Sequence, residues 1–202
     1  MSPHFKSQVG AVILAAGGSS RFGQPKQLVQ FRGTTLVRRT VNAAREAGCW
    51  PIIVVVGGAA EQVVGELAGM TALTVKNREW QCGIGGSIRC GIKHLLGSAP
   101  RVHAAVLLVC DQPFVNADTI RNLLRVWQRD NKSIVASTYA ETFGVPALFE
   151  HSFFPELLSL PDGVGAKSII LRNREYVAEC PFPEGSIDMD TPETYESVAR
   201  TT

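Results

Sequence analysis

Short apolar runs alternate with amphipathic helical patterns along most of the chain. Apolar runs of this length between turn residues predict buried strands, and a period near 3.6 predicts helices. The predicted strands cover residues 9–14, 52–56, 72–75, 104–110, 133–137, 146–149 and 176–179. The predicted helices cover residues 36–47, 61–67, 87–96, 118–128, 152–160, 165–171 and 192–199. Strands separated by helices predict a mostly parallel sheet with right-handed crossovers.

Several single residues predict where these elements begin and end. Gly48 is placed to end the helix over 36–47, and Asn116 or Asp118 to cap the helix over 118–128. Between Thr142 and Asp188 the pattern is less regular, which indicates a lid or an acceptor-binding insertion on the main sheet. With 202 residues and no linker or repeat, the chain is expected to form a single domain over 1–202.

Composition and charge narrow the classes of partner. A hydrophobic fraction of 45% suffices for a packed core, and a net charge of +2 without a long basic block argues against nucleic-acid and membrane binding. The cysteine count is five, an odd number without a C-x-x-C pair, which argues against a disulfide framework and a structural zinc site. A reduced, cytoplasmic location is expected, since the N-terminus has no signal-like apolar core and no apolar run approaches the length of a membrane helix.

The first candidate site is the loop LAAGGSSRFGQPKQL, which follows the first predicted strand. Its glycines, Gly17 and Gly18, allow backbone N–H groups to approach a phosphate or a base, and Arg21 and Lys26 can neutralise phosphate oxygens. The spacing is neither that of a Walker A loop nor that of the dinucleotide fingerprint. The alternative is an ordinary turn between strand and helix with exposed basic residues.

Two acidic positions form the second candidate site. Asp111 follows the most apolar strand in the motif CDQPF, where it can bind Mg²⁺ with a substrate phosphate or act as a turn or cap residue. In SIDMDTP, near the C-terminus, Asp190 is expected to cap the last helix. Asp188 points elsewhere if the segment is extended, and with Asp111 it would form a two-carboxylate Mg²⁺ site.

A third candidate is the glycine-rich stretch GIGGSIR over residues 83–89. Its glycines allow close approach to a flat ligand, and Ser87 can hydrogen-bond to one; the alternative is a flexible loop before a helix. The four histidines are expected to have surface or packing roles: His4, His94, His103 and His151.

These motifs, in this order, resemble those of the molybdenum cofactor nucleotidyltransferases, and of the cytidylyltransferases among them most closely. The opening loop matches the L-A-A-G-x-S-x-R-F-G-x-P-K signature, LLVCDQPFV matches L-L-V-x-D-Q-P, and IDMDTPETY matches D-I-D-T-P-E-D-Y with Met189 and Thr194 as the differences. The resemblance extends from about Val9 to the C-terminus.

The resemblance implies a fold, a reaction and a set of site residues. The fold would be a three-layer α/β/α, Rossmann-like, mostly parallel sheet of the nucleotide-diphospho-sugar transferase type. The reaction would transfer CMP from CTP to the terminal phosphate of molybdopterin or molybdenum cofactor, with Mg²⁺ or Mn²⁺ as the metal. A client molybdoenzyme of the xanthine dehydrogenase type would receive the product. Asp111 and Asp188 would hold the metal, and Arg21, Lys26 and Asp111 would be catalytic. The nucleotide would contact Leu14, Ala15, Ala16, Gly17, Gly18, Ser19, Arg21, Lys26, Gly86, Ser87 and Asp111.

The chain departs from the family pattern in one place, and three alternatives remain. Where the family has G-D-x-G-A-R, this chain has PDGVGAK over residues 161–167, which leaves the acceptor contacts open. The related guanylyltransferases usually begin L-A-G-G, so LAAG favours CTP over GTP. Isoprenoid cytidylyltransferases share the P-K-Q of the first loop but carry D-A-A-R-P in place of CDQP. A carrier that delivers the pterin cofactor without catalysis is the non-enzymatic alternative.

Overall fold

The computed structural model describes residues 8–18, 24–189 and 194. Its main strands are β1 (Val9–Ala15), β4 (Ile52–Val56), β5 (Leu73–Lys76), β6 (Ala104–Val109), β7 (Ile134–Tyr139), β8 (Thr142–Glu150) and β9 (Val177–Pro181). A small hairpin consists of β2 (Gln30–Phe31) and β3 (Thr34–Thr35). The helices are α1 (Leu36–Glu46), α2 (Ala60–Glu66), α3 (Ile84–Ser98), α4 (Ala117–Asp130), α5 (Phe154–Leu158) and α6 (Lys167–Arg172).

The main strands form one seven-stranded sheet in the order β5-β4-β1-β6-β8-β7-β9. Neighbours from β5 to β6 are parallel, as are β7 and β9, and β8 is antiparallel to both β6 and β7. The prediction of a mostly parallel α/β fold is confirmed. Since β8 alone reverses direction among the main strands of the described chain, β1, β4, β5, β6, β7 and β9 all end at the same edge of the sheet.

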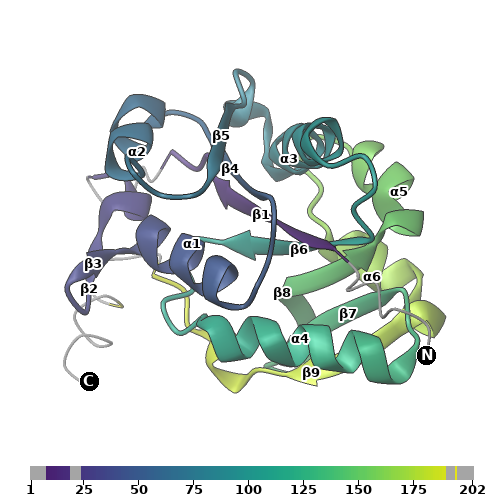
Figure 1. The fold of residues 1–202 in the computed structure, drawn as a ribbon. Helices are drawn as coiled ribbons and strands as arrows, with labels where there is room; N and C mark the ends of the chain where they lie inside the picture. Colours follow the sequence, from purple (N-terminus) through teal and green to yellow (C-terminus); the bar gives the residue numbers. More distant parts are fainter. Residues whose placement is uncertain (1–7, 19–23, 190–193, 195–202) are drawn as a thin grey trace, which may run out of the picture.

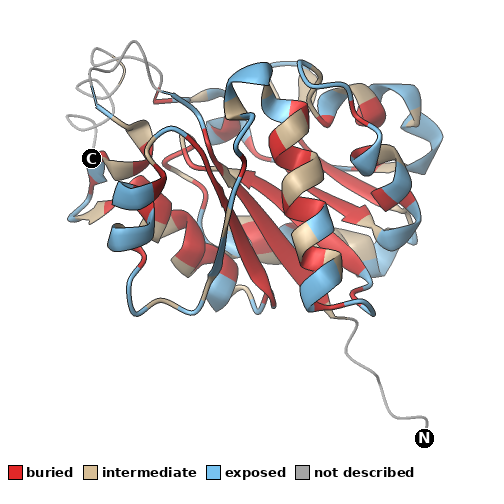
Figure 2. Cartoon of the chain, turned by 90° about the horizontal axis from the view of Figure 1, so that it is seen from above, coloured by how far each residue is buried: buried red, intermediate tan, exposed pale blue. Residues whose placement is uncertain are grey.

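Helices cover both faces of this sheet and give the molecule three layers (Figure 1). Side chains of a strand alternate between the two faces, so β1 sends Ile13 into one core cluster and Val12 into the other. The first cluster packs against α1, α2 and α4, and the second against α3, α5 and α6. Figure 2 shows the buried strands between the helical layers. Burial on both faces explains why the central strands are continuous apolar runs.

Most predicted elements are present, and the predicted residues at the end of α1 and the start of α4 have the expected roles. Gly48 follows α1 with φ of +88°, a conformation that glycine adopts without strain. Asn116, rather than Asp118, caps α4, because its side chain accepts hydrogen bonds from the N–H groups of Asp118 and Thr119. The helix predicted over 192–199 lies outside the described residues except for Thr194, which is helical.

The segment from Thr142 to Asp188 contributes directly to the sheet. It begins with β8, which lies inside the sheet between β6 and β7, and it includes β9 at the edge. β8 is longer than the predicted strand over 146–149, and its pairing with β7 shifts register between Ala136 and Ser137. Pro146 lacks an N–H group and weakens the strand signal, which accounts for the short prediction. None of the helices in the described ranges is long and apolar enough to cross a membrane.

Candidate active site

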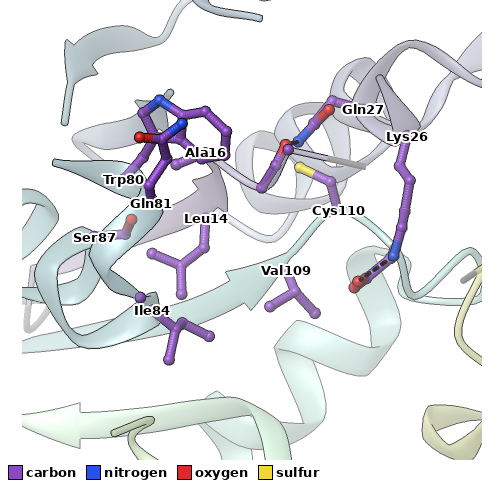
Figure 3. Close-up of a pocket in the computed structure, with 14 residues that line it drawn as sticks. Leu14, Ala16, Lys26, Gln27, Trp80, Gln81, Ile84, Ser87, Val109 and Cys110 are labelled. Atoms are coloured by element: carbon purple, nitrogen blue, oxygen red, sulfur yellow. Dashed lines mark hydrogen bonds and ion pairs between the residues drawn. The ribbon is translucent and has the colours of Figure 1, made fainter. Parts of the chain in front are cut away.

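A cavity of about 320 Å³ opens at the edge of the sheet where the parallel strands end. It lies between the loops that follow β1 and β6 and the first turn of α3, and Figure 3 shows its side chains. Ligands of open α/β sheets bind at this edge. The residues that line it are Leu14, Ala16, Gly17, Gly18, Lys26, Gln27, Trp80, Gln81, Gly83, Ile84, Ser87, Val109, Cys110 and Asp111.

The cavity has an apolar part and a charged part. Leu14, Ile84 and Val109 lie together on its apolar side in Figure 3. Lys26 and Asp111 lie at the other side, where the Lys26 ammonium nitrogen is 3.8 Å from a carboxylate oxygen of Asp111. A flat, weakly polar group would fit the first part and an anionic group the second, because apolar walls favour a ring and the cation favours phosphate oxygens.

The C-terminal motif reaches the same place. The N–H of Met189 donates a hydrogen bond of 2.8 Å to the backbone carbonyl of Asp111, so the exposed Asp188 leaves the chain directly beside Asp111. Burial raises the pKa of Tyr139, and the charges of both Asp188 and Asp111 raise it further. The charges of both carboxylates therefore act on the same phenol group, although the two acids are 77 residues apart in the sequence.

This pair suits a hard divalent ion such as Mg²⁺ or Mn²⁺. Carboxylate oxygens are ligands that these ions prefer, and Mg²⁺ usually takes one or two protein carboxylates and completes its shell with water and phosphate. Within the described ranges no cluster of three or more His, Cys, Asp or Glu side chains could hold a metal.

One glycine of the opening loop, Gly18, packs against the indole of Trp80. A side chain at Gly18 would lie 2.6 Å from the ring of Trp80, and side chains at Gly57 and Gly58 would lie 2.8 Å from the same residue. Gly17 has more space, and its carbonyl accepts a hydrogen bond of 2.9 Å from the amide nitrogen of Gln27. At Gly18 the atoms that come close are therefore those of Trp80, whereas at Gly17 the backbone is open toward the cavity.

The second glycine-rich stretch differs from its prediction in a similar way. Helix α3 begins at Ile84, three residues earlier than predicted. A Cβ at Gly83 or Gly85 would overlap backbone carbonyl oxygens of Asp162 and Pro161, and the N–H of Gly85 donates a hydrogen bond of 2.7 Å to the carbonyl of Asp162. These glycines therefore leave room for the turn at 160–164, and Gly83 also lines the cavity.

Two buried polar residues lie at the start of α3. The amide of Asn77 donates a hydrogen bond of 3.1 Å to the hydroxyl oxygen of Ser87, and both side chains are more than nine-tenths buried. The Ser87 hydroxyl accepts from Asn77, so its own proton can be donated to an acceptor in the cavity. This is the kind of group that orients a ligand in an apolar pocket.

The structure brings most of the predicted site residues to the cavity. Those that line it are Leu14, Ala16, Gly17, Gly18, Lys26, Ser87 and Asp111. The side chain of Ala15 packs in the core on the opposite face of β1, so a contact between Ala15 and a ligand would use its backbone. Gly86 lies in the first turn of α3 but does not line the cavity. Ser19 and Arg21 lie outside the described residues.

Sequence reasoning missed several lining residues. Trp80 and Gln81 belong to a short 3-10 turn, Trp80–Cys82, that no periodicity indicates. From the sequence, Ile84 and Val109 are indistinguishable from core residues because they are apolar. Nothing in the sequence around Gln27 marks it as a lining residue. Val109 could have been found, since it is the last residue of the strand that leads to Asp111.

The sheet, the glycine loop at the end of its first strand and the acidic residue at the end of β6 define a nucleotide-binding α/β protein. A family model, the MobA-like NTP transferase domain, matches residues 11–177. The chain belongs to this family, and it is a nucleotidyltransferase.

The similarity to proteins of known structure or sequence extends over nearly the whole chain. The crystal structure of Rv0371c from Mycobacterium tuberculosis H37Rv shares 32% identity at a TM-score of 0.80, covering 96% of this chain and 98% of that one. Rv0371c has also been solved in complex with manganese, at 30% identity, a TM-score of 0.77 and coverage of 96% and 100%. Nicotine blue oxidoreductase of Paenarthrobacter nicotinovorans is 28% identical over 92% of this chain and 93% of its own length. The fold is that of the nucleotide-diphospho-sugar transferases.

Proposed function

We propose that the protein transfers CMP from CTP to the terminal phosphate of molybdopterin or molybdenum cofactor and releases pyrophosphate, with Mg²⁺ as the metal and Mn²⁺ as a substitute. The observation that carries the proposal is the meeting of three features at one edge of the sheet. They are an apolar cavity of about 320 Å³, the pair of Lys26 and Asp111, and Asp188 bound beside Asp111 through Met189. The manganese complex of Rv0371c supports a divalent ion in this family.

The attacking group in this reaction is itself an anion near neutral pH, so no strong general base is required. The remaining requirements are alignment of two anionic reactants and neutralisation of their charge. A metal bound between Asp111 and Asp188 would supply positive charge to the α-phosphate. Lys26 would offset charge on the leaving pyrophosphate together with the predicted Arg21, which precedes it in the same loop of the sequence. The hydroxyl of Ser87 would orient the base against Leu14 and Ile84.

The preference for CTP derives from the opening LAAG of residues 14–17, because the guanylyltransferases that the chain resembles usually begin L-A-G-G. The acceptor side is proposed to lie near residues 161–167. That turn packs directly on the start of α3 through Gly83 and Gly85, so it lies next to the cavity.

We extend the proposal to a cytoplasmic location, supported by five free cysteines, and to delivery to a molybdoenzyme of the xanthine dehydrogenase type.

The proposal is tested by measuring pyrophosphate release with Mg²⁺ and either molybdopterin or methylerythritol phosphate as the acceptor, using CTP and GTP in parallel. We expect release with CTP. Release with GTP alone would assign a guanylyltransferase, and release only with methylerythritol phosphate would assign the isoprenoid reaction. Tight pterin binding without pyrophosphate release for any acceptor would indicate the carrier alternative. Since one relative is named nicotine blue oxidoreductase, turnover of nicotine blue is followed in the same samples.

A single substitution tests the role of Asp111. We expect Asp111→Ala to abolish turnover and leave the fold intact, because the carboxylate is partly exposed and its ion pair with Lys26 contributes little to stability. Circular dichroism and thermal melting check the fold, and the control is Asp130→Ala, which removes a partly exposed acid that pairs with Arg129 at the end of α4. Normal turnover by folded Asp111→Ala protein would exclude Asp111 from catalysis.

A further inference from the structure

Gln112, the residue after Asp111, is buried and makes hydrogen bonds to two separate segments of the chain. Its side chain is more than nine-tenths buried, and its amide nitrogen donates to the carbonyl of Val145 at 3.0 Å and to the carbonyl of Gly185 at 2.9 Å. Val145 lies in β8, and Gly185 lies in the turn Pro183–Ser186 that leads to Asp188. One amide group therefore joins the end of β6, the start of β8 and the C-terminal motif.

This amide and a backbone hydrogen bond hold the C-terminal motif at two points. Gly185 is bound by the side chain of Gln112, and the N–H of Met189 is bound by the carbonyl of Asp111. Asp188 lies between these two points of attachment. Its position relative to Asp111 is consequently set in part by these two attachments of the backbone.

Tyr139 at the end of β7 completes the arrangement. Its hydroxyl donates to the carbonyl of Val145 at 3.1 Å and lies 3.5 Å from the amide nitrogen of Gln112. The ring fills the space beside Gly185, where a Cβ would lie 2.5 Å from a ring carbon, and a Cβ at Gly144 would overlap the hydroxyl. The phenol thus packs against the same turn that Gln112 binds, and both acids raise its pKa in addition to burial.

The carbonyl oxygen of the Gln112 side chain argues against a purely stabilising role. Its carbonyl oxygen is buried and has no hydrogen-bond partner in the described part of the chain. The orientation of the amide is not ambiguous, because the two atoms facing its nitrogen are carbonyl oxygens, which can only accept. A buried oxygen left unpaired lowers stability, so the contribution of this amide lies in what its two N–H groups hold in place.

We propose that Gln112 is a positioning residue that sets the separation of Asp111 and Asp188, so that both carboxylates bind the same divalent ion. The inference rests on the metal site of the proposed function. Gln112 does not touch the ion; it acts through Gly185 and the segment that carries Asp188. Residues that orient metal ligands in this way typically change metal affinity by about 10- to 100-fold when they are replaced.

The test measures Mn²⁺ binding to the full chain by electron paramagnetic resonance, without nucleotide or acceptor. We expect Gln112→Met, which keeps the side-chain length but cannot donate, to raise the Kd for Mn²⁺ by about 10-fold or more. Tyr139→Phe should raise it by roughly threefold, less than that range, because Gln112 keeps both carbonyl partners. Thermal melting of each variant is recorded alongside.

Ser137→Ala is the matched control. Ser137 is fully buried on β7, and its hydroxyl donates a hydrogen bond of 2.6 Å to the carbonyl of Pro146, next to Val145. This variant loses a buried hydrogen bond to the same strand but none to the C-terminal motif. We expect it to lose stability and to bind Mn²⁺ as the wild type does.

The outcomes separate a positioning role from a structural one. Wild-type Mn²⁺ affinity in Gln112→Met, with a loss of melting temperature like that of Ser137→Ala, would overturn the inference. If Gln112→Met does not fold, Tyr139→Phe decides: weaker binding supports the inference, and wild-type binding refutes it. Equal Mn²⁺ affinity in wild type and Asp111→Ala would refute both this inference and the metal site. Absence of pyrophosphate release with normal Mn²⁺ binding would contradict the proposed function alone.

Discussion

Lys26 and Asp111 show how the charged part of the site is built from single residues. The ammonium and carboxylate groups are 3.8 Å apart, with about a fifth and a third of their side-chain surfaces exposed. A pair this accessible to water contributes little to the free energy of unfolding, with a typical value of about 0–1 kcal/mol. Both groups can therefore exchange this contact for contacts to a ligand at small cost. Their position at the mouth of an apolar cavity is consistent with binding of a phosphorylated molecule.

We expect Lys26→Ala to lower the rate of nucleotidyl transfer by about 10²-fold or more at saturating nucleotide, the usual loss for one group that stabilises transition-state charge. The measurement is steady-state pyrophosphate release. Lys132→Ala is the control, since Lys132 is a surface lysine bound to the backbone carbonyl of Glu175. An unchanged rate in Lys26→Ala at saturating CTP would contradict the proposed role.

Helix α3 shows how an element positions the site through its glycines. Its first turn carries Ile84 and Ser87 into the cavity, and the turn at 160–164 packs against it. Arg89, two residues after Ser87, reinforces this contact by donating to the carbonyl of Leu160 and pairing with the carboxylate of Asp162. The proposed acceptor segment and the wall of the cavity are consequently one packed unit.

Two glycines of this helix provide a matched pair for a test. A Cβ at Gly85 would overlap the carbonyl oxygen of Pro161, whereas nothing lies within 4 Å of a Cβ at Gly97. We expect Gly85→Ala to destabilise the protein by about 1–3 kcal/mol, as overpacking does, and to raise the KM for nucleotide because Ile84 and Ser87 shift. Gly97→Ala should be neutral or stabilising by up to about 1 kcal/mol, because alanine is the better helix former.

The comparison is made by denaturant unfolding together with nucleotide titration. Equal stability and equal KM in Gly85→Ala and wild type would show that the turn at 160–164 does not depend on this close contact. A change in stability without a change in KM would show that the turn packs on α3 but does not support the cavity wall.

The whole molecule places the site where separate parts of the chain meet. The cavity takes residues from the loop after β1, the turn before α3, and the end of β6, and Asp188 adds the segment after β9. A ligand in the cavity would contact all of these while the unfolded chain would bind it poorly. Nucleotide binding is therefore expected to stabilise the entire fold.

We expect CTP with Mg²⁺ at about 100 times its Kd to add about 2.7 kcal/mol to the free energy of unfolding. For a chain of this size that corresponds to a rise in melting temperature of roughly 5–11 °C. A thermal-shift screen of CTP, GTP, UTP and ATP measures it. A rise with CTP alone would assign the donor base, and a rise with GTP alone would contradict the proposed preference.

The sequence predicted the elements well where the pattern is local. β4 has the predicted bounds, and β1 and β6 differ from prediction by one residue at an end, because a buried central strand is apolar at every position. The hairpin of β2 and β3 was missed, since two-residue strands carry no period. β8 was predicted too short because Pro146 interrupts its pattern.

The sequence by itself determined the α/β alternation, the mostly parallel sheet, the position of Asp111 at the end of a predicted strand and that of Lys26 in the loop after another, because these depend on periodicity and on neighbours along the chain. Only the tertiary structure decided that Asp188 lies beside Asp111, that Gln112 joins β6 to the C-terminal motif, and that Gly18 and Gly85 make room for Trp80 and Pro161. These are contacts between residues far apart in the chain. Their partners are set by how the layers pack, and no local pattern records them.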